Sequence, residues 1–346
     1  MTASQVACTI DLSAPGKQLG RLQLPKITNT GGWASTFIPI ASVANGDGPN
    51  VLVLAGNHGD EYEGQVAALR LIQELEPEQV SGRVTIIPVL STAASKANTR
   101  MWPSGINFNR SFPGSPDGSP DEQLADYPTR FMFPPSDVVM DMHSGGRTAW
   151  FIPCSHMHVV DDAEQRRTML AGMQAWNSDY HFLYIDVNGT GLLCVEAEDQ
   201  GKLVITTELG GGGRVPPAVH ELAWSGLTNV LRHVGVLEGE VVTRASLGLP
   251  EAVILDGRDP ANYVIAPEDG IFEGLLEPPA EVRAGDPVAR LWFPDTPGRP
   301  PEVLRAPLDG VLAVIRSIPA TEAGDGLFTT GQPIDPKELD PGARLT

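Results

Sequence analysis

The chain has few cysteines. Cys8, Cys154 and Cys194 are the only three among 346 residues, and no two of them have the spacing of a Cys-x-x-Cys motif. This pattern suggests neither a disulfide framework nor a zinc site built from thiolates. A reducing cytoplasm is therefore the compartment that we expect.

Basic residues are also scarce. The chain has 24 Lys and Arg residues against 43 Asp and Glu residues, which gives a net charge of -19. Such a charge repels phosphate backbones and anionic lipid surfaces. We therefore expect neither a nucleic acid nor a membrane as a partner. The acidity itself is explained most simply as a solvated surface that keeps the protein soluble.

Long hydrophobic runs are missing as well. No apolar run approaches the length of about 18 residues that indicates a membrane-spanning helix. The first residues, MTASQVACTIDLS, contain neither the basic start nor the apolar segment of a signal peptide. The sequence thus predicts no export and no membrane span.

What is present is the composition of a globular protein rich in turns. Hydrophobic residues make up 41% and charged residues 19%, with 37 Gly and 31 Pro. From about residue 50 to 237, short apolar runs alternate with helical patterns, which predicts an α/β fold: a sheet with helices on both faces. We expect strands at 51–55, 84–90, 138–142, 181–187 and 203–209. We expect helices at 61–75, 121–131, 162–177, 192–200 and 218–234.

The first of these helices has large apolar residues at steps of three: Val66, Leu69, Ile72 and Leu75. This spacing predicts one stripe that packs on the sheet. Residues 1 to about 45 read as short extended pieces with turns at 29–32 and 45–48, and we expect them to form edge strands.

From about residue 249 the sequence changes to short β-rich runs. Asp269-Gly270 and Asp309-Gly310 each precede an apolar strand, which predicts a small β-barrel-like unit with an internal repeat. Such a unit resembles the half-motifs of biotinyl/lipoyl carriers, but neither Asp-Gly turn has a Lys to carry a prosthetic group. A structural or substrate-shaping cap is therefore expected. The predicted domains are 1–48 (N-terminal β extension), 49–240 (catalytic domain) and 249–346 (β-rich cap).

The most informative motif is His58-x-x-Glu61 in the stretch VLVLAGNHGDEYEG. A strand-like run breaks at Gly56 and delivers the pair into a loop that leads into a helix. A His and a carboxylate three residues apart can converge at a first helical turn, as ligands of a catalytic zinc often do. The alternative is a surface His beside a helix-capping acid.

A third ligand is expected at another strand end, because catalytic zinc usually has three protein ligands and one open position. The run 138–142 ends in His143, within Asp-Met-His-Ser-Gly-Gly. Open α/β sheets place functional groups at such ends. The alternative for His143 is a histidine with a purely structural role.

A carboxylate that moves protons is expected at a third strand end. Zinc lowers the pKa of a bound water to about 7, but a neighbouring base must still take its proton and pass it to the leaving amine. Glu208 stands at the end of the run 203–209, before four consecutive glycines. The alternative is that Glu208 caps the following helix.

Substrate recognition is expected in the segment ANTRMWPSGINFNRSFPG. Asn109 and Arg110 together can bind a carboxylate, since a guanidinium offers two parallel donors and the amide adds a third. Arg100 is a second cation, suited to polarising the scissile carbonyl.

These motifs, in this order, resemble the succinylglutamate desuccinylase/aspartoacylase family. The resemblance covers about residues 50 to 237 and implies a zinc carboxypeptidase-like fold: a mixed sheet with helices on both faces, with the β-rich tail as a cap. It implies His58, Glu61 and His143 as ligands of one zinc ion per chain. It implies Glu208 as general acid/base, Arg100 as the carbonyl-polarising group, and Asn109 with Arg110 as the carboxylate clamp.

One position departs from the family pattern. The sequence NFNR stands where many members have Asp-Leu-Asn-Arg, so that Asn107 replaces an acid. This replacement puts in question an interaction that supports the metal ligands.

Within the family, the segment TTELGGGG, the tail GDPVARLWFPD and the overall length resemble the ectoine-utilisation deacetylases. The implied reaction is hydrolysis of Nα-acetyl-L-2,4-diaminobutyrate, a small-molecule N-acyl amino acid, to acetate and diaminobutyrate. Alternatives are an N-succinylglutamate or N-acetylaspartate type of deacylase, a carboxypeptidase, and, in a different class, a catalytically silent binding protein on the same fold. A symmetric homo-oligomer is the common default for such proteins.

Overall fold

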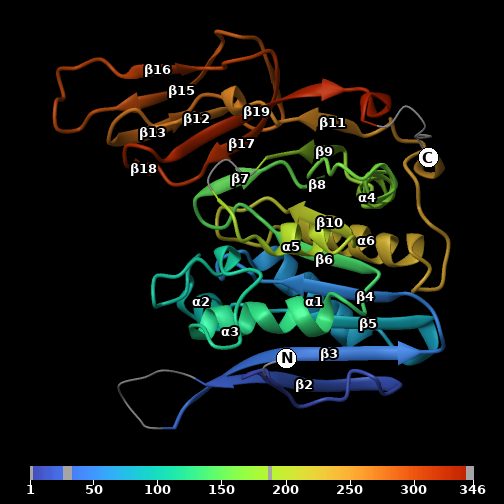
Figure 1. Cartoon of the computed structure of the whole chain (residues 1–346). Coiled ribbons are helices and arrows are strands. Elements are labelled where there is room, and N and C mark those ends of the chain that lie inside the picture. The colour runs from blue at the N-terminus through green and yellow to red at the C-terminus, as the bar shows by residue number, and fades with distance from the viewer. Residues whose placement is uncertain (1–2, 26–32, 186–188, 340–346) are drawn as a thin grey trace.

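The structure is a computed structural model that describes residues 3–25, 33–185 and 189–339. Within these residues one large mixed sheet runs through the molecule, from the N-terminal strands at one end to the C-terminal strands at the other (Figure 1). Its strand order is β1 (Ala7–Cys8), β2 (Gly16–Pro25), β3 (Ser35–Asn45), β5 (Gly82–Ile87), β4 (Asn50–Ala55), β6 (Val138–His143), β10 (Leu203–Glu208), β8 (Cys154–Met157), β9 (Tyr180–Leu183), β11 (Val253–Asp256), β19 (Gly326–Ile334), β17 (Gly310–Arg316) and β14 (Ala280–Val282). Two short strands lie off this path: β12 (Tyr263–Ile265) pairs with β19, and β7 (Ala149–Phe151) pairs with β17.

The centre of the sheet is parallel. Strand β4 pairs parallel with β5 and β6, and β6 pairs parallel with β10. The N-terminal strands β1, β2 and β3 add an antiparallel edge, as expected for this part of the chain. The predicted turn at 29–32 and the end of the predicted strand 181–187 lie outside the described residues.

Helices cover both faces of the sheet, which confirms the predicted fold class. They are α1 (Tyr62–Glu74), α2 (Thr92–Ala97), α3 (Pro120–Tyr127), α4 (Ala163–Ala175), α5 (Leu193–Asp199) and α6 (Pro217–His233). A π-helical turn, Pro128–Met132, continues α3. Short 3-10 turns occur at Pro77–Gln79, Phe108–Arg110, Ala245–Leu247, Pro260–Asn262 and Pro336–Glu338. None of these helices is long and apolar enough to cross a membrane.

The two faces arise because side chains alternate along a strand. In β4, Leu52 and Leu54 belong to a core that includes residues of α3 and α5. Val51 and Val53 belong to a second core, which includes residues of α1 and α6. A strand buried on both sides must be apolar at every position, which explains the continuous run that marks it in the sequence.

The predicted packing face of α1 is wrong at Val66 and Leu69, whereas Ile72 and Leu75 do pack on the core. Val66 and Leu69 are among the exposed hydrophobic residues, whereas Ala67, Ala68 and Leu71 are buried. Steps of three residues drift around a helix of 3.6 residues per turn, so Val66 and Leu75 cannot share a narrow stripe. Small residues face the sheet here, and they let the helix lie close to it.

The C-terminal region forms antiparallel strands around its own core. A second sheet, in the order β16 (Glu302–Arg305), β15 (Pro287–Trp292), β13 (Gly270–Gly274) and β18 (Ala320–Thr321), shares an apolar core with the end of the large sheet. The expected Asp-Gly entries are present: β13 follows Asp269 and β17 follows Asp309. Each of these carboxylates accepts a backbone N–H from a distant turn. The boundaries of the three predicted domains stay a prediction.

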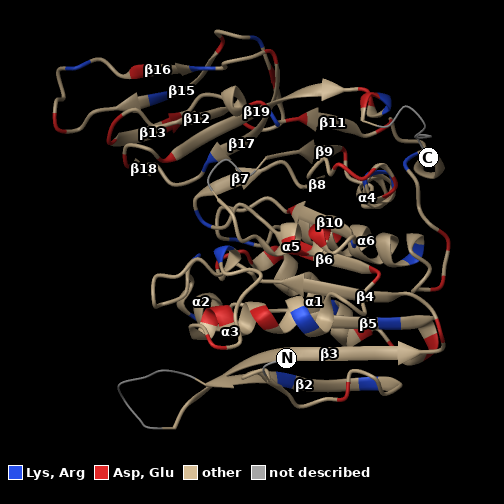
Figure 2. Cartoon of the chain, viewed as in Figure 1, with Lys and Arg blue, Asp and Glu red and all other residues tan. Residues whose placement is uncertain are grey.

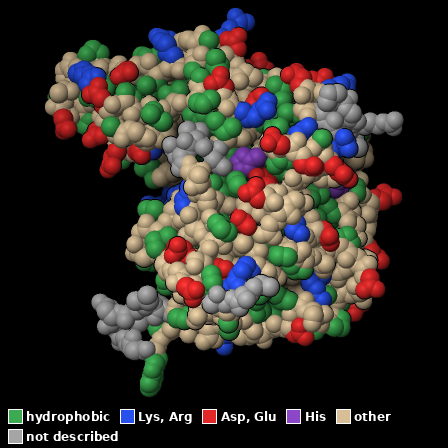
Figure 3. All heavy atoms as spheres, viewed as in Figure 1, with side chains coloured by type: hydrophobic (Ala, Val, Ile, Leu, Met, Phe, Trp, Pro, Cys, Tyr) green, Lys and Arg blue, Asp and Glu red, His purple; other side chains and the backbone are tan. Residues whose placement is uncertain are grey.

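Charged side chains are spread over the surface. Figure 2 shows acidic residues in most loops and helix ends, with fewer basic ones between them. On the face drawn in Figure 3, Lys and Arg form no continuous patch. This distribution agrees with the expectation of a solvated acidic surface.

Candidate active site

The carboxyl ends of three neighbouring parallel strands meet at one edge of the sheet. Ala55 ends β4, His143 ends β6 and Glu208 ends β10, and His143 and Glu208 are direct partners in the strand pairing. Val139 and Val204 belong to the core that includes residues of α5, so His143 and Glu208, at even spacing from them, point toward the same face. The topology therefore brings together groups that lie 65 positions apart in the sequence.

Glycines shape the loop that carries His58. Gly56, directly after β4, has a φ of +63°, in the left-handed region that favours glycine. A Cβ at Gly59 would lie 2.2 Å from the backbone of Ala94, in α2. The loop can therefore turn sharply and pack against α2 only with these residues, which places His58 and Glu61 at the strand end.

His58, Glu61 and His143 converge as predicted. His58 Nδ1 lies 2.7 Å from Glu61 Oε1, and His143 Nδ1 lies 2.7 Å from Glu61 Oε2. One ligand atom from each of the three residues lies within 4.8 Å of the others, and all three residues are buried. Glu61 occupies the N-cap position of α1, but its side chain makes no capping hydrogen bond. The alternative of a surface His beside a helix-capping acid is therefore wrong.

The second ring nitrogen of each histidine has a partner behind the cluster. His58 Nε2 lies 3.2 Å from Asn107 Oδ1, and His143 Nε2 lies 2.9 Å from Asp141 Oδ2. Partners of this kind orient metal-binding imidazoles and fix the tautomer. The interaction questioned at Asn107 is thus made, but by an amide oxygen in place of a carboxylate.

Asp141 was not among the predicted site residues. The signal was in the sequence, because Asp141-x-His143 on a strand puts both side chains on one face. Asp141 is fully buried, and its carboxylate contacts the ring nitrogen of His143 that faces away from Glu61.

The donor set suits zinc. Two imidazoles and one carboxylate form the usual protein ligands of a hydrolytic zinc site, which keeps one position open. Here both rings present Nδ1 to Glu61, and their Nε2 atoms are held from behind. Such an arrangement is suited to a metal, because one donor atom from each of the three residues already lies within 4.8 Å of the others.

Glu208 lies at the same cavity and is partly buried. Its Oε2 atom has no hydrogen-bond partner within the described part of the chain. Burial and, to a smaller extent, the charge of Glu61 raise the pKa of Glu208 to about 8, while His143 and Arg100 act in the opposite direction. Helix α6 begins only at Pro217 and has Pro216 at its N-cap, so the alternative of Glu208 as a helix cap is wrong.

Arg100 reaches the cluster from the loop after α2. Its Nη1 donates to Glu61 Oε1 at 2.9 Å, while about half of its side chain, 47%, stays exposed. A guanidinium at this place is next to the metal ligands and open to an incoming molecule.

Asn109 and Arg110 lie on the 3-10 turn Phe108–Arg110 and line the same cavity. Asn109 is buried, and its Oδ1 accepts the backbone N–H of Leu193 at 2.9 Å, which ties the turn to the start of α5. Because the amide oxygen is used in this way, the amide N–H group is the one that can serve a ligand. Arg110 Nη1 donates to the carbonyl of Asn109 at 2.6 Å.

The cavity encloses about 230 Å³, and its wall includes residues that the sequence did not point to. Phe151, His156, Tyr184, Leu192 and Cys194 line it together with the predicted residues. Phe151 belongs to β7, which pairs with β17 of the C-terminal region. Strand β17 of the C-terminal region therefore pairs with the strand that carries Phe151 in the cavity wall.

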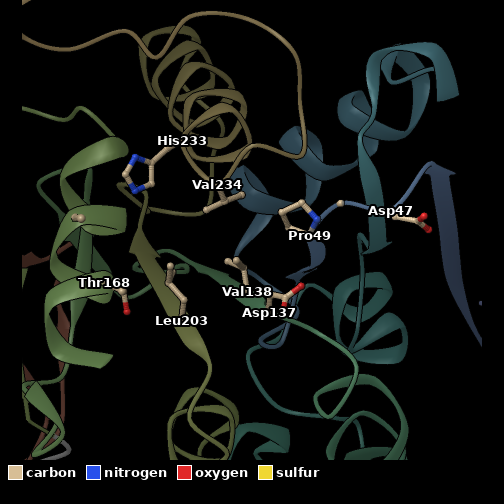
Figure 4. A pocket seen from close by; sticks show the side chains of 10 residues that line it. Asp47, Pro49, Asp137, Val138, Thr168, Leu203, His233 and Val234 are labelled. Carbon is tan, nitrogen blue, oxygen red and sulfur yellow. The ribbon is translucent and has the colours of Figure 1, made fainter. Parts of the chain in front are cut away.

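A different hollow lies at the opposite edge of the sheet. Figure 4 shows it lined by Asp47, Pro49, Asp137, Val138, Thr168, Leu203, His233 and Val234. Val138 and Leu203 begin β6 and β10, so this hollow is at the amino ends of the strands. It holds no cluster of metal-binding side chains among the described residues. The candidate metal ligands and Glu208 therefore lie at the carboxyl ends of the strands, where open α/β sheets place functional groups.

Comparison with known proteins agrees with this geometry. Residues 47–234 match the model of the succinylglutamate desuccinylase/aspartoacylase catalytic domain. The chain is 39% identical over 335 residues to the N-alpha-acetyl-L-2,4-diaminobutyric acid deacetylase of Halomonas elongata, covering 96% of both proteins. The product-bound ectoine utilization protein EutE (DoeB) from Ruegeria pomeroyi is 36% identical, with a TM-score of 0.91 over 96% of this chain and 100% of that one. A succinylglutamate desuccinylase/aspartoacylase from Rhodobacter sphaeroides is 33% identical, with a TM-score of 0.91 and the same coverage.

Proposed function

Since the chain belongs to the succinylglutamate desuccinylase/aspartoacylase family, we propose that it hydrolyses the amide of Nα-acetyl-L-2,4-diaminobutyrate and releases acetate and L-2,4-diaminobutyrate. The observation that carries the proposal is the convergence of His58, Glu61, His143 and Glu208 on one buried cavity. The full-length relative from Halomonas elongata, which is named for this deacetylation, supports the choice of substrate.

We assign the metal to His58, Glu61 and His143, with one zinc ion per chain. When bound, zinc supplies a Lewis acid that polarises the amide carbonyl and lowers the pKa of a water molecule. Asn107 and Asp141 hold the two imidazole rings from behind and so keep the ligand atoms in place.

Glu208 is the proton carrier in this proposal. Its carboxylate takes a proton from the attacking water as the oxygen–carbon bond forms, and gives it to the amide nitrogen as the carbon–nitrogen bond breaks. Glu208 is placed for both steps, because it lines the same cavity as the three proposed ligands and its Oε2 atom has no hydrogen-bond partner among the described residues. One carboxylate then serves as base and as acid in a single turnover.

Arg100, Arg110 and Asn109 hold the rest of the substrate. Arg100, beside Glu61, is placed to donate to the carbonyl oxygen as negative charge builds up on it. The Arg110 guanidinium and the Asn109 amide N–H group bind the α-carboxylate. These two contacts orient the amide toward Glu208.

The cavity favours a small neutral acyl group over an acidic one. Arg100 and Arg110 are the two Lys or Arg side chains among the described residues that line it. With one arginine for the carbonyl and one for the α-carboxylate, none remains to pair with the second carboxylate of a succinyl or aspartyl group. The structure therefore supports deacetylation over desuccinylation.

A substrate panel with the purified protein tests the proposal. We expect turnover of Nα-acetyl-L-2,4-diaminobutyrate, and at most weak turnover of the Nγ-acetyl isomer, N-succinylglutamate and N-acetylaspartate. Preference for a succinyl or aspartyl substrate would overturn the assignment of the acyl group.

Metal analysis of the active enzyme tests the cofactor. About one zinc per chain is expected after dialysis, and a chelator should remove both zinc and activity. Full activity without bound metal would overturn the assignment of His58, Glu61 and His143.

A further inference from the structure

One histidine in the cavity wall has no place in the mechanism above. His156, on β8, lines the cavity that His58, Glu61, His143 and Glu208 share. We propose that His156 binds the distal ammonium group of the substrate through Nε2, and so makes the enzyme selective for a diamino acid. This inference rests on the proposed function, which supplies a substrate with such a group.

His156 is buried and has an unused polar atom. The residue is 6% exposed, and Nε2 has no hydrogen-bond partner within the described residues. Burial lowers the pKa of His156 well below its ordinary value, and the nearby His143 and His158 lower it further. A neutral imidazole carries one lone pair that can accept an N–H, which is what an ammonium ion offers.

Neighbouring side chains fix the position of the ring. The Tyr184 ring stands edge-on to that of His156, with centroids 4.3 Å apart, and the His158 ring lies on Tyr184 at 4.0 Å. His158 Nδ1 in turn lies 2.9 Å from a carboxylate oxygen of Glu198, which is buried. A ring held in this way is a rigid acceptor, and rigidity lowers the entropic cost of binding.

The positively charged residues that line the cavity leave room for an amino acid with a cationic side chain. Both arginines of the cavity wall belong to the segment 100–110, which the proposed function gives to the carbonyl and the α-carboxylate. The lining also contains Phe151, His156, Tyr184, Leu192 and Cys194, none of which is a Lys or Arg. Beside His156 an ammonium ion meets the aromatic ring of Tyr184, 4.3 Å away between centroids, and a neutral acceptor.

The substrate class that follows is a short N-acyl amino acid with an amine at the end of its side chain. A matched analogue exists, because Nα-acetyl-L-norvaline has a methyl group where Nα-acetyl-L-2,4-diaminobutyrate has the ammonium. A site built to bind an N–H group discriminates strongly against an analogue that lacks it, since a buried acceptor is then left unpaired.

The test compares kcat/KM for these two substrates in the wild-type enzyme, in His156→Leu and in His156→Gln. We expect the wild type to prefer the diamino substrate by about 100-fold or more. His156→Leu should lose most of this preference, because kcat/KM for the diamino compound should fall far more than kcat/KM for the norvaline compound. His156→Gln keeps a polar acceptor near the position of Nε2 and should retain part of the preference.

A binding measurement accompanies the kinetics and does not depend on hydrolysis of the amide. L-2,4-diaminobutyrate should inhibit the wild type more strongly than L-norvaline does, and His156→Leu should remove the difference. The matched control is His181→Leu, which changes another fully buried histidine outside this cavity. The control should leave the ratio of the two substrates unchanged, even if it lowers thermal stability.

The outcomes separate the two proposals. A wild-type enzyme that hydrolyses neither compound overturns the proposed function and, with it, the role of His156. A wild-type enzyme that hydrolyses the diamino substrate, together with a His156→Leu variant that keeps the preference or loses both activities equally, overturns the role of His156 alone.

Discussion

Asp141 and His143 stand two residues apart on β6, and Asp141 Oδ2 lies 2.9 Å from His143 Nε2. The carboxylate thereby orients the ring and makes His143 a stronger ligand. We expect Asp141→Asn to weaken zinc binding by about 10- to 100-fold. Competition with a chromophoric chelator measures this change.

The matched control for that variant is Asp137→Asn, next to the start of the same strand. Asp137 is exposed and accepts the backbone N–H of Asn50 at 2.8 Å, far from the ligands. Its replacement should leave zinc affinity unchanged. Equal affinities of Asp141→Asn and the wild type would show that the contact at Nε2 does not tune the metal site.

The convergence of His58, Glu61, His143 and Glu208 could be predicted from the sequence because each lies at or just beyond the carboxyl end of an apolar run. Parallel strands bring their ends together, so that local signals at residues 58, 143 and 208 imply one site. Asp141 carried a signal too, through the period of two on a strand, but buried acids within strands are easily attributed to structure.

Other features depend on tertiary packing that no local pattern encodes. His156 lies on a strand of four residues without a motif, and only the antiparallel pairing of β8 with β10 brings it beside the site. The packing face of α1 was predicted from its large residues, whereas the buried face of the helix contains Ala67 and Ala68. A hydrophobic pattern is judged mainly from large apolar side chains, but a helix that packs closely on a sheet can require small side chains at the contact.

Glu208 offers a second prediction. Glu208→Gln keeps the shape of the side chain but cannot carry the proton, so kcat should fall by about 100- to 10,000-fold while zinc stays bound. Steady-state kinetics and metal analysis of the same sample test both parts. A kcat near that of the wild type would remove Glu208 from the mechanism.

A matched control for Glu208→Gln is Glu63→Gln. Glu63 is buried, accepts a hydrogen bond from Ser144 Oγ at 2.7 Å, and has its pKa raised to about 7, mainly by burial. It is absent from the described lining of the cavity. We expect a far smaller loss of kcat for Glu63→Gln, which would separate proton transfer from the general effect of neutralising a buried acid.

Arg110 gives a third prediction, on recognition of the α-carboxylate. Hydrogen bonds to a charged group contribute about 1.5 to 3 kcal/mol, so Arg110→Ala should lower kcat/KM by about 10- to 100-fold. The same variant should act on N-acetyl-1,3-diaminopropane, which lacks the carboxylate, about as fast as the wild type does. Arg147→Ala, at a cation outside the described lining, is the control and should change neither rate. Equal losses on both compounds in Arg110→Ala would contradict the carboxylate contact.

His181 supplies a fourth prediction, on stability and pH. It is fully buried on β9, and its Nδ1 lies 2.8 Å from Ser155 Oγ, which itself donates to the carbonyl of Met173. The ring nitrogen therefore donates its hydrogen, as a neutral imidazole does. Burial, with a smaller contribution from the charge of Arg244, lowers the pKa of His181 from 6.5 to about 3.

Between pH 6.5 and 3 the unfolded chain consequently binds a proton at His181 that the folded protein does not bind. The contribution of this group to stability is complete above pH 6.5 and is lost progressively as the pH falls toward 3. At pH 5 the loss is about 2 kcal/mol, an upper figure for one histidine.

His181→Asn keeps an N–H donor for Ser155 but cannot titrate, so its free energy of unfolding should fall less steeply below pH 6.5 than that of the wild type. Urea unfolding followed by circular dichroism between pH 5 and pH 8 measures both slopes. Glu63 and Glu208 titrate in both proteins, so their contributions cancel when the two free energies of unfolding are subtracted. If the free energies of the wild type and the variant changed equally with pH, His181 would be protonated in the folded state as readily as in the unfolded chain.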